Sequence, residues 1–128
     1  MAEKVVVDAS AVLAMLLLEK GGDKVADVIG RACISSVNLI EVLTKLIDKG
    51  QPASEARRTL AMLQLDVEPV DEALALTAAA MRDRTRSFGL SLGDRVCLSL
   101  AQRLNAIAYT ADREWKKIDL GIEVVSIR

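Results

Sequence analysis

Five short apolar runs along the chain are typical of buried strands. They cover residues 4–7, 32–35, 67–70, 106–110 and 122–127. The first run reads "VVV" without any polar alternation, and such runs are found in parallel sheets whose two faces are both covered. The pattern therefore predicts strands that are buried by helices on both sides.

Longer stretches with a helical repeat separate these runs. In residues 37–49 the apolar side chains recur every three or four positions, at Val37, Ile40, Leu43 and Ile47. This spacing places them on one face of a helix. Similar patterns predict helices over residues 10–18, 53–63, 71–84 and 92–104, with Gly50 suited to end one helix and Pro52 to begin the next.

The alternation of strands and helices favours right-handed crossovers and a parallel sheet. We expect an α/β protein, a three-layer α/β/α sandwich with a central parallel sheet of about five strands. Residues 1–128 should form one domain, because 52% hydrophobic content is ample for a single core. The stretch 10–18 is apolar nearly all round, so it is either buried within the chain or covered by a second chain in a homodimer.

Composition excludes several kinds of chemistry and of location. The chain has no histidine, which excludes Ser-His-Asp and Cys-His catalysis and histidine-ligated zinc. Cys33 and Cys97 lie far apart in apolar surroundings, so we expect free buried thiols. The most apolar stretch, 11–18, falls short of the roughly 20 residues that cross a bilayer, and the N-terminus lacks a signal-peptide pattern. We expect a cytoplasmic protein with no membrane partner.

Four acidic residues should gather at one end of the predicted sheet. Ligands bind an open parallel sheet beyond the carboxyl ends of its strands. Asp8 and Asp112 directly follow two of the strands. Glu41 lies in the helix after the second strand, and Asp94 lies near the start of the helix that precedes the fourth.

Each of these acids also has a simpler explanation. Asp is a favoured helix N-cap and contributes about 0.5–2 kcal/mol there. Asp8, Asp94 and Asp112 could each do no more than this. Glu41 lies beyond capping range and could occupy an ordinary solvated helix face.

Taken together, the four carboxylates point to a bound cation. Carboxylates that share a site raise one another's pKa unless a cation offsets their charge, and hard oxygen ligands suit Mg²⁺ or Mn²⁺. Such an ion can activate water and stabilise a phosphoryl group without histidine. The net charge of −1 argues at first against a nucleic-acid partner, but assigning four of the 18 acids to the site leaves 14 against 17 basic residues. The remaining surface is then mildly basic and suits a phosphodiester ligand.

The chain resembles the PIN-domain family, and within it the VapC-type toxins of bacterial toxin-antitoxin pairs, in five ordered motifs: "VVVDASAVLAMLL", "SSVNLIEVL", "GLSLGDRVCLSLA", "AYTADREW" and "DLGIEVVSIR". The resemblance covers nearly the whole chain. It implies a single PIN domain that acts as a Mg²⁺- or Mn²⁺-dependent endoribonuclease toxin. It also implies a usually dimeric protein, with RNA as the substrate and a cognate antitoxin that holds the enzyme inactive.

The resemblance also assigns residues. The family's acidic catalytic and metal-binding positions fall on the four acids already identified, Asp8, Glu41, Asp94 and Asp112. Its hydroxyl positions fall on Ser10 and Thr110, where they could orient a carboxylate or a metal-bound water.

Other polar and aromatic residues are weaker candidates. Arg82, Arg84 and Arg86 could contact phosphate or the antitoxin, but basic residues near a helix end are more often only solvated. Arg95 adjoins a proposed ligand in the sequence. Trp115 could stack a base, although the lone Trp of a small domain more often packs in its core.

Other function classes remain open. A non-catalytic RNA- or protein-binding PIN-like module would have no reason to hold a divalent ion. A receiver-type signalling domain would need two acids after the first strand and a lysine after the last, where this chain has Asp8 alone and ends in "EVVSIR". A phosphatase of the D-x-D type would need an aspartate in place of Ser10.

Overall fold

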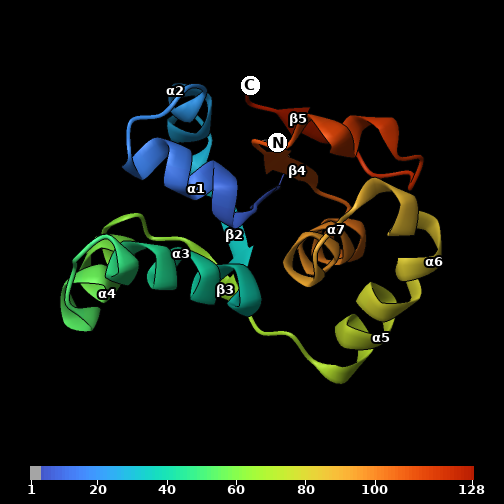
Figure 1. The fold of residues 1–128 in the computed structure, drawn as a ribbon, viewed down its shortest axis with the longest axis horizontal. Coiled ribbons are helices and arrows are strands. Elements are labelled where there is room, and N and C mark those ends of the chain that lie inside the picture. Colours follow the sequence, from blue (N-terminus) through green and yellow to red (C-terminus); the bar gives the residue numbers. More distant parts are fainter. Residues whose placement is uncertain (1–3) are drawn as a thin grey trace.

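Five strands form a parallel sheet in a computed structural model that describes residues 4–128. The order across the sheet is β3-β2-β1-β4-β5 (Figure 1). The strands are β1 (Val5–Val7), β2 (Ala32–Ser35), β3 (Asp66–Glu68), β4 (Ile107–Thr110) and β5 (Val124–Ser126). The predicted α/β fold with a parallel sheet of five strands is confirmed.

Helices connect the strands. They are α1 (Ala9–Leu16), α2 (Gly22–Ala26), α3 (Ser36–Asp48), α4 (Ala53–Met62), α5 (Glu72–Ala80), α6 (Arg82–Thr85) and α7 (Leu92–Leu104). Short 3₁₀ turns are η1 (Ile29–Arg31), η2 (Arg86–Phe88) and η3 (Arg113–Lys117). Between residues 4 and 128, none of the helices has the length and apolar character that a membrane span requires.

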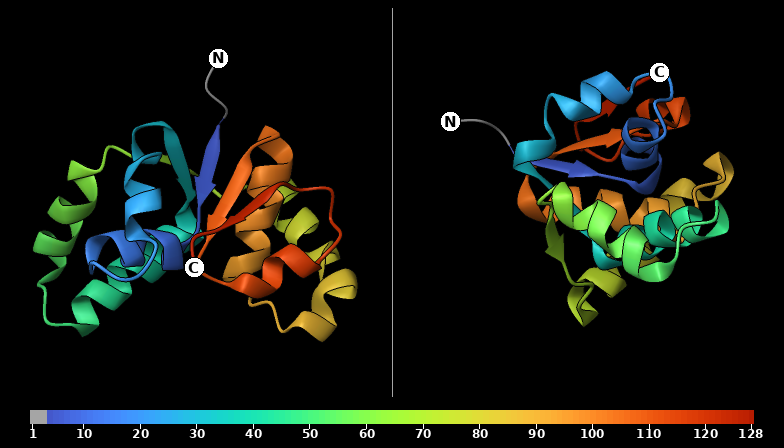
Figure 2. Two further views of the ribbon diagram at one scale, coloured as in Figure 1. Left: turned by 90° about the horizontal axis from the view of Figure 1, so that it is seen from above. Right: turned by 90° about the vertical axis from the view of Figure 1, so that its left-hand side faces the viewer.

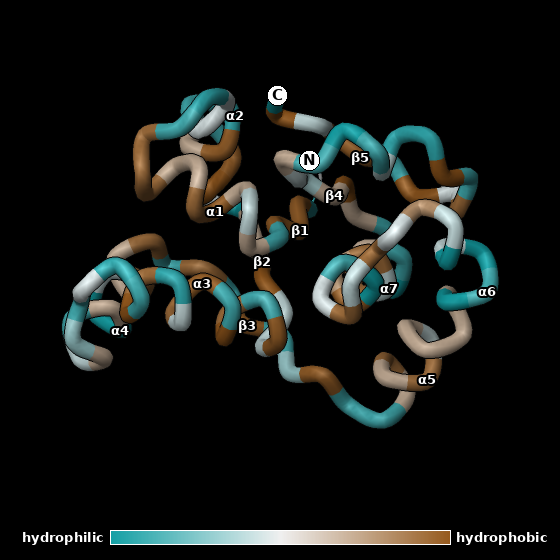
Figure 3. The backbone as a smooth tube through the Cα atoms, in the orientation of Figure 1, coloured by the Kyte–Doolittle hydropathy of each residue, from teal (hydrophilic) through white to brown (hydrophobic). Residues whose placement is uncertain are grey.

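The central strand β1 divides the core into two layers. Its three valines are fully buried, and successive side chains of a strand point to opposite faces. Val5 and Val7 therefore join the core formed with α1 to α4, whereas Val6 joins the core formed with α5 and α7. Figures 1 and 2 show the two groups of helices on either side of the strands. Figure 3 shows hydrophobic segments along the central strands and a hydrophilic α6.

Several predicted boundaries differ from the structure. The first helix ends at Leu16 rather than residue 18, because Leu18 adopts a left-handed φ of 57° and is 92% exposed. The third strand begins and ends earlier than predicted, since Asp66–Glu68 is a largely exposed edge strand without a strong apolar pattern. The helix predicted over 71–84 is divided at Met81 into α5 and α6. The short α2 and η3 were not predicted at all.

The apolar first helix is covered in part by the chain itself. It packs against α2 and α3, and Ala11, Val12 and Ala14 are buried. Leu13 and Met15 stay partly exposed. Burial within the chain therefore explains one side of α1 and leaves the other side accessible.

Residues after β5 fit tightly into the turn between α1 and α2. The Ile127 side chain is 1% exposed, and its amide donates to the Thr110 carbonyl oxygen at 2.9 Å. Gly21 has a φ of +89°, and a Cβ atom at this position would overlap the Ile127 carbonyl group. Only glycine combines this backbone conformation with so close an approach. The segment that follows β5 is thus held against the turn between α1 and α2.

We expect Gly21→Ala to lower the free energy of unfolding by about 2–4 kcal/mol, since it adds both backbone strain and a steric clash. Gly30→Ala is the matched control, because Gly30 has nothing within 4 Å of the added Cβ atom. Urea unfolding followed by circular dichroism measures both variants. Equal stability of the two variants would contradict the tight fit at Ile127.

Candidate active site

The four predicted acids line one cleft at the carboxyl ends of the strands. The cleft has a volume of about 500 Å³. Asp8 follows β1, Glu41 lies on α3, Asp94 lies in the first turn of α7 and Asp112 follows β4. The remaining polar side chains that line the cleft are Ser10, Asn38, Lys45 and Arg128. The structure therefore brings together all four acids and the hydroxyl of Ser10.

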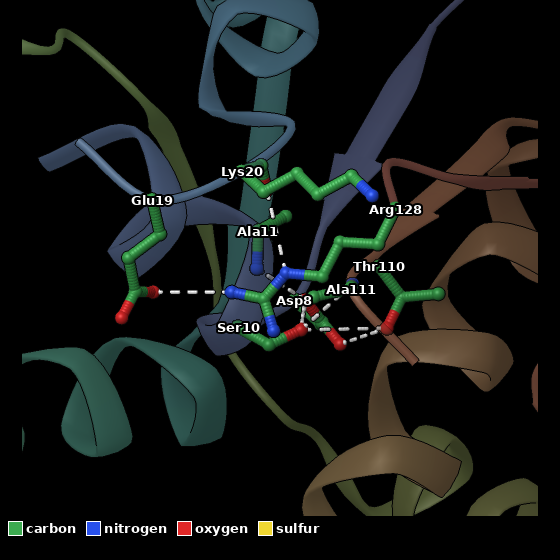
Figure 4. A network of polar contacts seen from close by, with 8 residues as sticks. All are labelled: Asp8, Ser10, Ala11, Glu19, Lys20, Thr110, Ala111 and Arg128. Carbon is green, nitrogen blue, oxygen red and sulfur yellow. Dashed lines mark hydrogen bonds and ion pairs between the residues drawn. The ribbon is translucent and has the colours of Figure 1, made fainter. Parts of the chain in front are cut away.

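Asp8 is the buried member of the group, with 4% of its surface exposed. Its Oδ1 accepts hydrogen bonds from the Ser10 hydroxyl at 2.7 Å and from the Ala11 amide at 2.8 Å. Its Oδ2 accepts one from the Thr110 hydroxyl at 2.6 Å (Figure 4). The predicted hydroxyl positions thus both contact the same carboxylate. They fix its orientation from α1 and from β4.

Burial and neighbouring charge oppose ionisation of Asp8 and Asp94. Burial raises the pKa of Asp8 to about 6, in spite of its three hydrogen bonds, and the charge of Asp94 adds to the increase. Burial likewise raises the pKa of Asp94, with a further contribution from the charge of Asp112. Asp94 is therefore electrostatically coupled to both of the other aspartates.

The capping explanation is also correct for three of the acids. Asp8 is the N-cap of α1, and Asp112 is the N-cap of η3, where its Oδ1 accepts from the Glu114 amide at 2.9 Å. Asp94 forms a capping box with Ser91, in which its Oδ2 accepts from the Ser91 amide at 2.9 Å. Capping fixes each carboxylate at the cleft and leaves lone pairs for a ligand, so the two roles are compatible.

Glu41 is held by a different set of contacts. The buried Asn38, one helical turn earlier, donates from Nδ2 to Glu41 Oε1 at 2.6 Å and to the Gly93 carbonyl oxygen at 3.2 Å. A Cβ atom on Gly93 would lie 2.6 Å from Glu41 Oε1. The absence of a side chain at Gly93 therefore lets the Glu41 carboxylate lie against α7, close to Asp94.

The cleft carries an excess of acidic side chains, because four carboxylates share it with two basic residues, Lys45 and Arg128. Among residues 4–128, the ion pairs involve none of the four acids. No three acidic or cysteine side chains in that range are arranged to hold a metal ion directly. Mg²⁺ keeps several waters in proteins and typically contacts one or two carboxylates. The oxygen donors and the excess of negative charge therefore fit a hydrated Mg²⁺ or Mn²⁺ ion in chemical type.

Three polar residues that line the cleft were not predicted from the sequence, namely Asn38, Lys45 and Arg128. Asn38 precedes Glu41 by three positions and Lys45 follows it by four, so helical spacing was the available signal for both. Arg128 reaches the cleft only through the pairing of β5 with β4, which no local pattern reveals.

The weaker candidates lie outside the cleft. Trp115 is 1% exposed and packs in the core, so the stacking interpretation is wrong. The Arg95 guanidinium is directed to α5, where Nη1 donates to the Ala78 carbonyl oxygen at 3.0 Å. None of the three arginines of α6 and η2 lines the cleft, namely Arg82, Arg84 and Arg86. Cys33 and Cys97 are buried free thiols, as predicted.

A family model matches this chain, whereas a comparison with curated protein sequences finds no match. The family model described as PIN domain matches residues 5–120. No curated protein sequence matches at a significant level.

Solved structures share the fold at low sequence identity. A toxin-antitoxin complex from Klebsiella pneumoniae matches with a TM-score of 0.74 and 18% identity, covering 98% of both chains. A DNA-bound VapBC from Salmonella typhimurium matches with a TM-score of 0.69 and 20% identity, over 99% of this chain and 100% of the other. VapC20 of Mycobacterium tuberculosis, described as a sarcin-ricin loop cleaving toxin, matches with a TM-score of 0.72 and 20% identity, over 89% and 94%.

We expect Asp8→Asn to stabilise the metal-free protein at neutral pH. The folded-state pKa of Asp8, about 6, lies above the ordinary value of 3.8, so the folded chain retains a proton that the unfolded chain releases. The contribution of Asp8 to the free energy of unfolding is therefore lost as the pH rises from about 4 to about 6. A neutral amide removes this loss, which corresponds to about 1–3 kcal/mol above pH 6.

Urea unfolding in EDTA at pH 4 and pH 7.5 measures this effect as the difference between variant and wild type, which cancels the other titrating groups. The expected difference is small at pH 4 and favours the variant at pH 7.5. A variant that is equally destabilised at both pH values would show that hydrogen bonding, rather than buried charge, dominates at Asp8.

Proposed function

The chain belongs to the PIN domain family, and we propose that it is a metal-dependent endoribonuclease toxin that hydrolyses RNA phosphodiester bonds. The main support for this proposal is the cleft lined by four carboxylates, none of which forms an ion pair within residues 4–128. The structural likeness to a toxin described as cleaving the sarcin-ricin loop supports RNA as the substrate class.

The four acids would have different roles, as metal ligands or in orienting water, according to their positions in the cleft. We assign Asp8 and Asp94 as direct ligands of Mg²⁺ or Mn²⁺, because both line the cleft and the charge of Asp94 helps to raise the pKa of Asp8. Asp112 would complete the ligand shell directly or through water. Glu41, held by Asn38 at 2.6 Å, would orient the attacking water.

The hydroxyl residues would act through Asp8. Ser10 and Thr110 donate to different oxygens of this carboxylate and so keep its lone pairs aimed at the cleft. A bound divalent ion would supply activation of water and stabilisation of the negative charge on the phosphoryl group. The chain has no histidine to take up a proton, which is why the proposal depends on this ion.

A partner protein is part of the proposed function. The likeness to VapBC complexes supports a cognate antitoxin as the inhibitor. An apolar cavity of about 210 Å³ between α3, α4 and β3, lined by residues such as Leu39, Leu43 and Leu60, could receive apolar side chains of that partner.

We also propose a homodimer, for which the accessible side of α1 and the 62% exposed Ile40 are suitable apolar surfaces. The proposed site of action is the cytoplasm.

A non-catalytic RNA- or protein-binding module is the second candidate. The exposed apolar side chains Ile40, Leu76 and Leu92 favour it, because they could bind a macromolecule without any chemistry. A binding module of this kind does not account for four carboxylates gathered in one cleft. The receiver-type signalling domain has less support, because the cleft contains one acid from β1 and no lysine from β5.

We expect the purified chain to cleave RNA with Mg²⁺ or Mn²⁺ and to lose this activity in EDTA. Attack by water should leave a 5′-phosphate and a 3′-hydroxyl, whereas attack by the ribose 2′-hydroxyl would leave a cyclic phosphate. Asp8→Asn and Glu41→Gln should each reduce the cleavage rate by at least about 100-fold, as expected when a group that positions ion or water is lost.

Mass spectrometry of the product ends and gel-based cleavage rates measure these outcomes. Asp71→Asn is the control, because Asp71 is an exposed helix cap that pairs with Arg103 outside the cleft. Cleavage that persists in EDTA or in Asp8→Asn, or products that carry a cyclic phosphate, would contradict the mechanism.

A further inference from the structure

Arg128 brings a guanidinium group to the acidic cleft without pairing with any of its acids. It lines the cleft together with Asp8, Asp94 and Asp112. Its ion pair is instead with Glu19, where Nη2 lies 3.3 Å from Oε1. Its Nε donates to the Lys20 carbonyl oxygen at 3.3 Å. Figure 4 shows the guanidinium between Glu19 and the network around Asp8.

The fold fixes the position of Arg128 through its neighbour. Ile127 is buried, its amide is bonded to the Thr110 carbonyl oxygen at 2.9 Å, and its carbonyl lies against Gly21. Thr110 also donates to Asp8. The backbone that carries Arg128 is therefore tied to the residue that orients the buried carboxylate, so the guanidinium has a defined place at the cleft.

The side chain of Arg128 is nevertheless free to exchange its partner. Arg128 and Glu19 have side chains that are 36% and 47% exposed, and ion pairs of this kind contribute only about 0–1 kcal/mol. Within residues 4–128, the Arg128 Nη1 makes no hydrogen bond. A guanidinium with a weak partner and a free donor is suited to bidentate binding of a phosphate.

We propose that Arg128 is a substrate contact that binds a phosphate of the RNA backbone adjoining the acidic cleft, and that Glu19 holds this guanidinium in place until RNA replaces it. This inference rests on the proposed function, because it takes RNA as the ligand of the same cleft. It explains how a cleft rich in carboxylates attracts a polyanion. The other cation that lines the cleft is the exposed Lys45 of α3.

A purely structural role is the competing explanation. The pair of Arg128 with Glu19 could serve only to fasten the chain after β5 to the α1–α2 turn. The two explanations predict different changes in RNA binding when Glu19 is removed. If the pair is a fastener, removing either partner should have the same effect. If Arg128 binds phosphate, Glu19 competes with RNA, and removing it should leave binding unchanged or make it stronger.

The test is the binding of a fluorescein-labelled single-stranded RNA of about 12 nucleotides, followed by anisotropy in Ca²⁺ over a series of salt concentrations. We expect Arg128→Gln to weaken binding about 3- to 10-fold and to reduce the salt slope by about 0.7, the value for one phosphate contact on a single strand. Arg128→Lys should retain the slope. Glu19→Gln should bind as tightly as wild type or more tightly.

Arg103→Gln is the matched control. Arg103 forms an exposed ion pair with Asp71, with side chains 37% and 56% exposed, and its loss changes the net charge equally outside the cleft. The proposal is overturned if Arg128→Gln and Arg103→Gln behave alike, or if Glu19→Gln weakens binding as Arg128→Gln does. Thermal unfolding of each variant shows whether it is folded. RNA binding by wild type without cleavage would overturn the proposed function and leave the test of Arg128 valid.

Discussion

The buried carboxylate of Asp8 connects the central strand to both sides of the cleft. It begins α1 by accepting from the Ala11 amide, and it accepts from Thr110 at the end of β4. The Ser10 hydroxyl in turn accepts from the Ala111 amide at 2.9 Å. Strands β1 and β4 are therefore joined beyond their last paired residues by one acid. A charge in this position is costly, because burial raises its pKa to about 6.

The same side chains serve both the fold and the cleft. Asp8 and Asp112 begin helical turns, and Asp94 closes a capping box. Helix starts after parallel strands place their caps at one edge of the sheet, so a set of ordinary caps becomes a cluster of negative charge. Glu41 is the exception, since it caps nothing and depends on Asn38 and the missing side chain at Gly93. The contacts of Glu41 do not cap a helix or form an ion pair within residues 4–128, so they favour a functional role for this side chain.

Local patterns predicted most of the fold and the acids of the cleft. The "VVV" run was sufficient for β1, and the helical repeat of 37–49 correctly predicted a helix at α3. The repeat predicted the wrong buried face, because Ile40 and Ile47 are 62% and 44% exposed. The buried residues of α3 are Asn38, Val42 and Leu46. β3 was misplaced since an exposed edge strand such as Asp66–Glu68 carries little apolar signal. Arg128 was missed because its place depends on the register of β5 against β4 and on the Gly21 turn. Contacts between residues so far apart in the chain leave no periodic trace in the sequence.

Binding of a divalent ion by the carboxylates of the cleft is the basis of the proposed function, and calorimetric titration with Mn²⁺ at pH 7.5 measures it. We expect saturable binding to wild type, loss of that binding in Asp94→Asn, and unchanged binding in Asp71→Asn, whose carboxylate lies outside the cleft. Asp94 is the informative position because its charge is coupled to Asp8 and, separately, to Asp112. Absence of binding to wild type, or equal binding to wild type and Asp94→Asn, would contradict metal binding by these carboxylates.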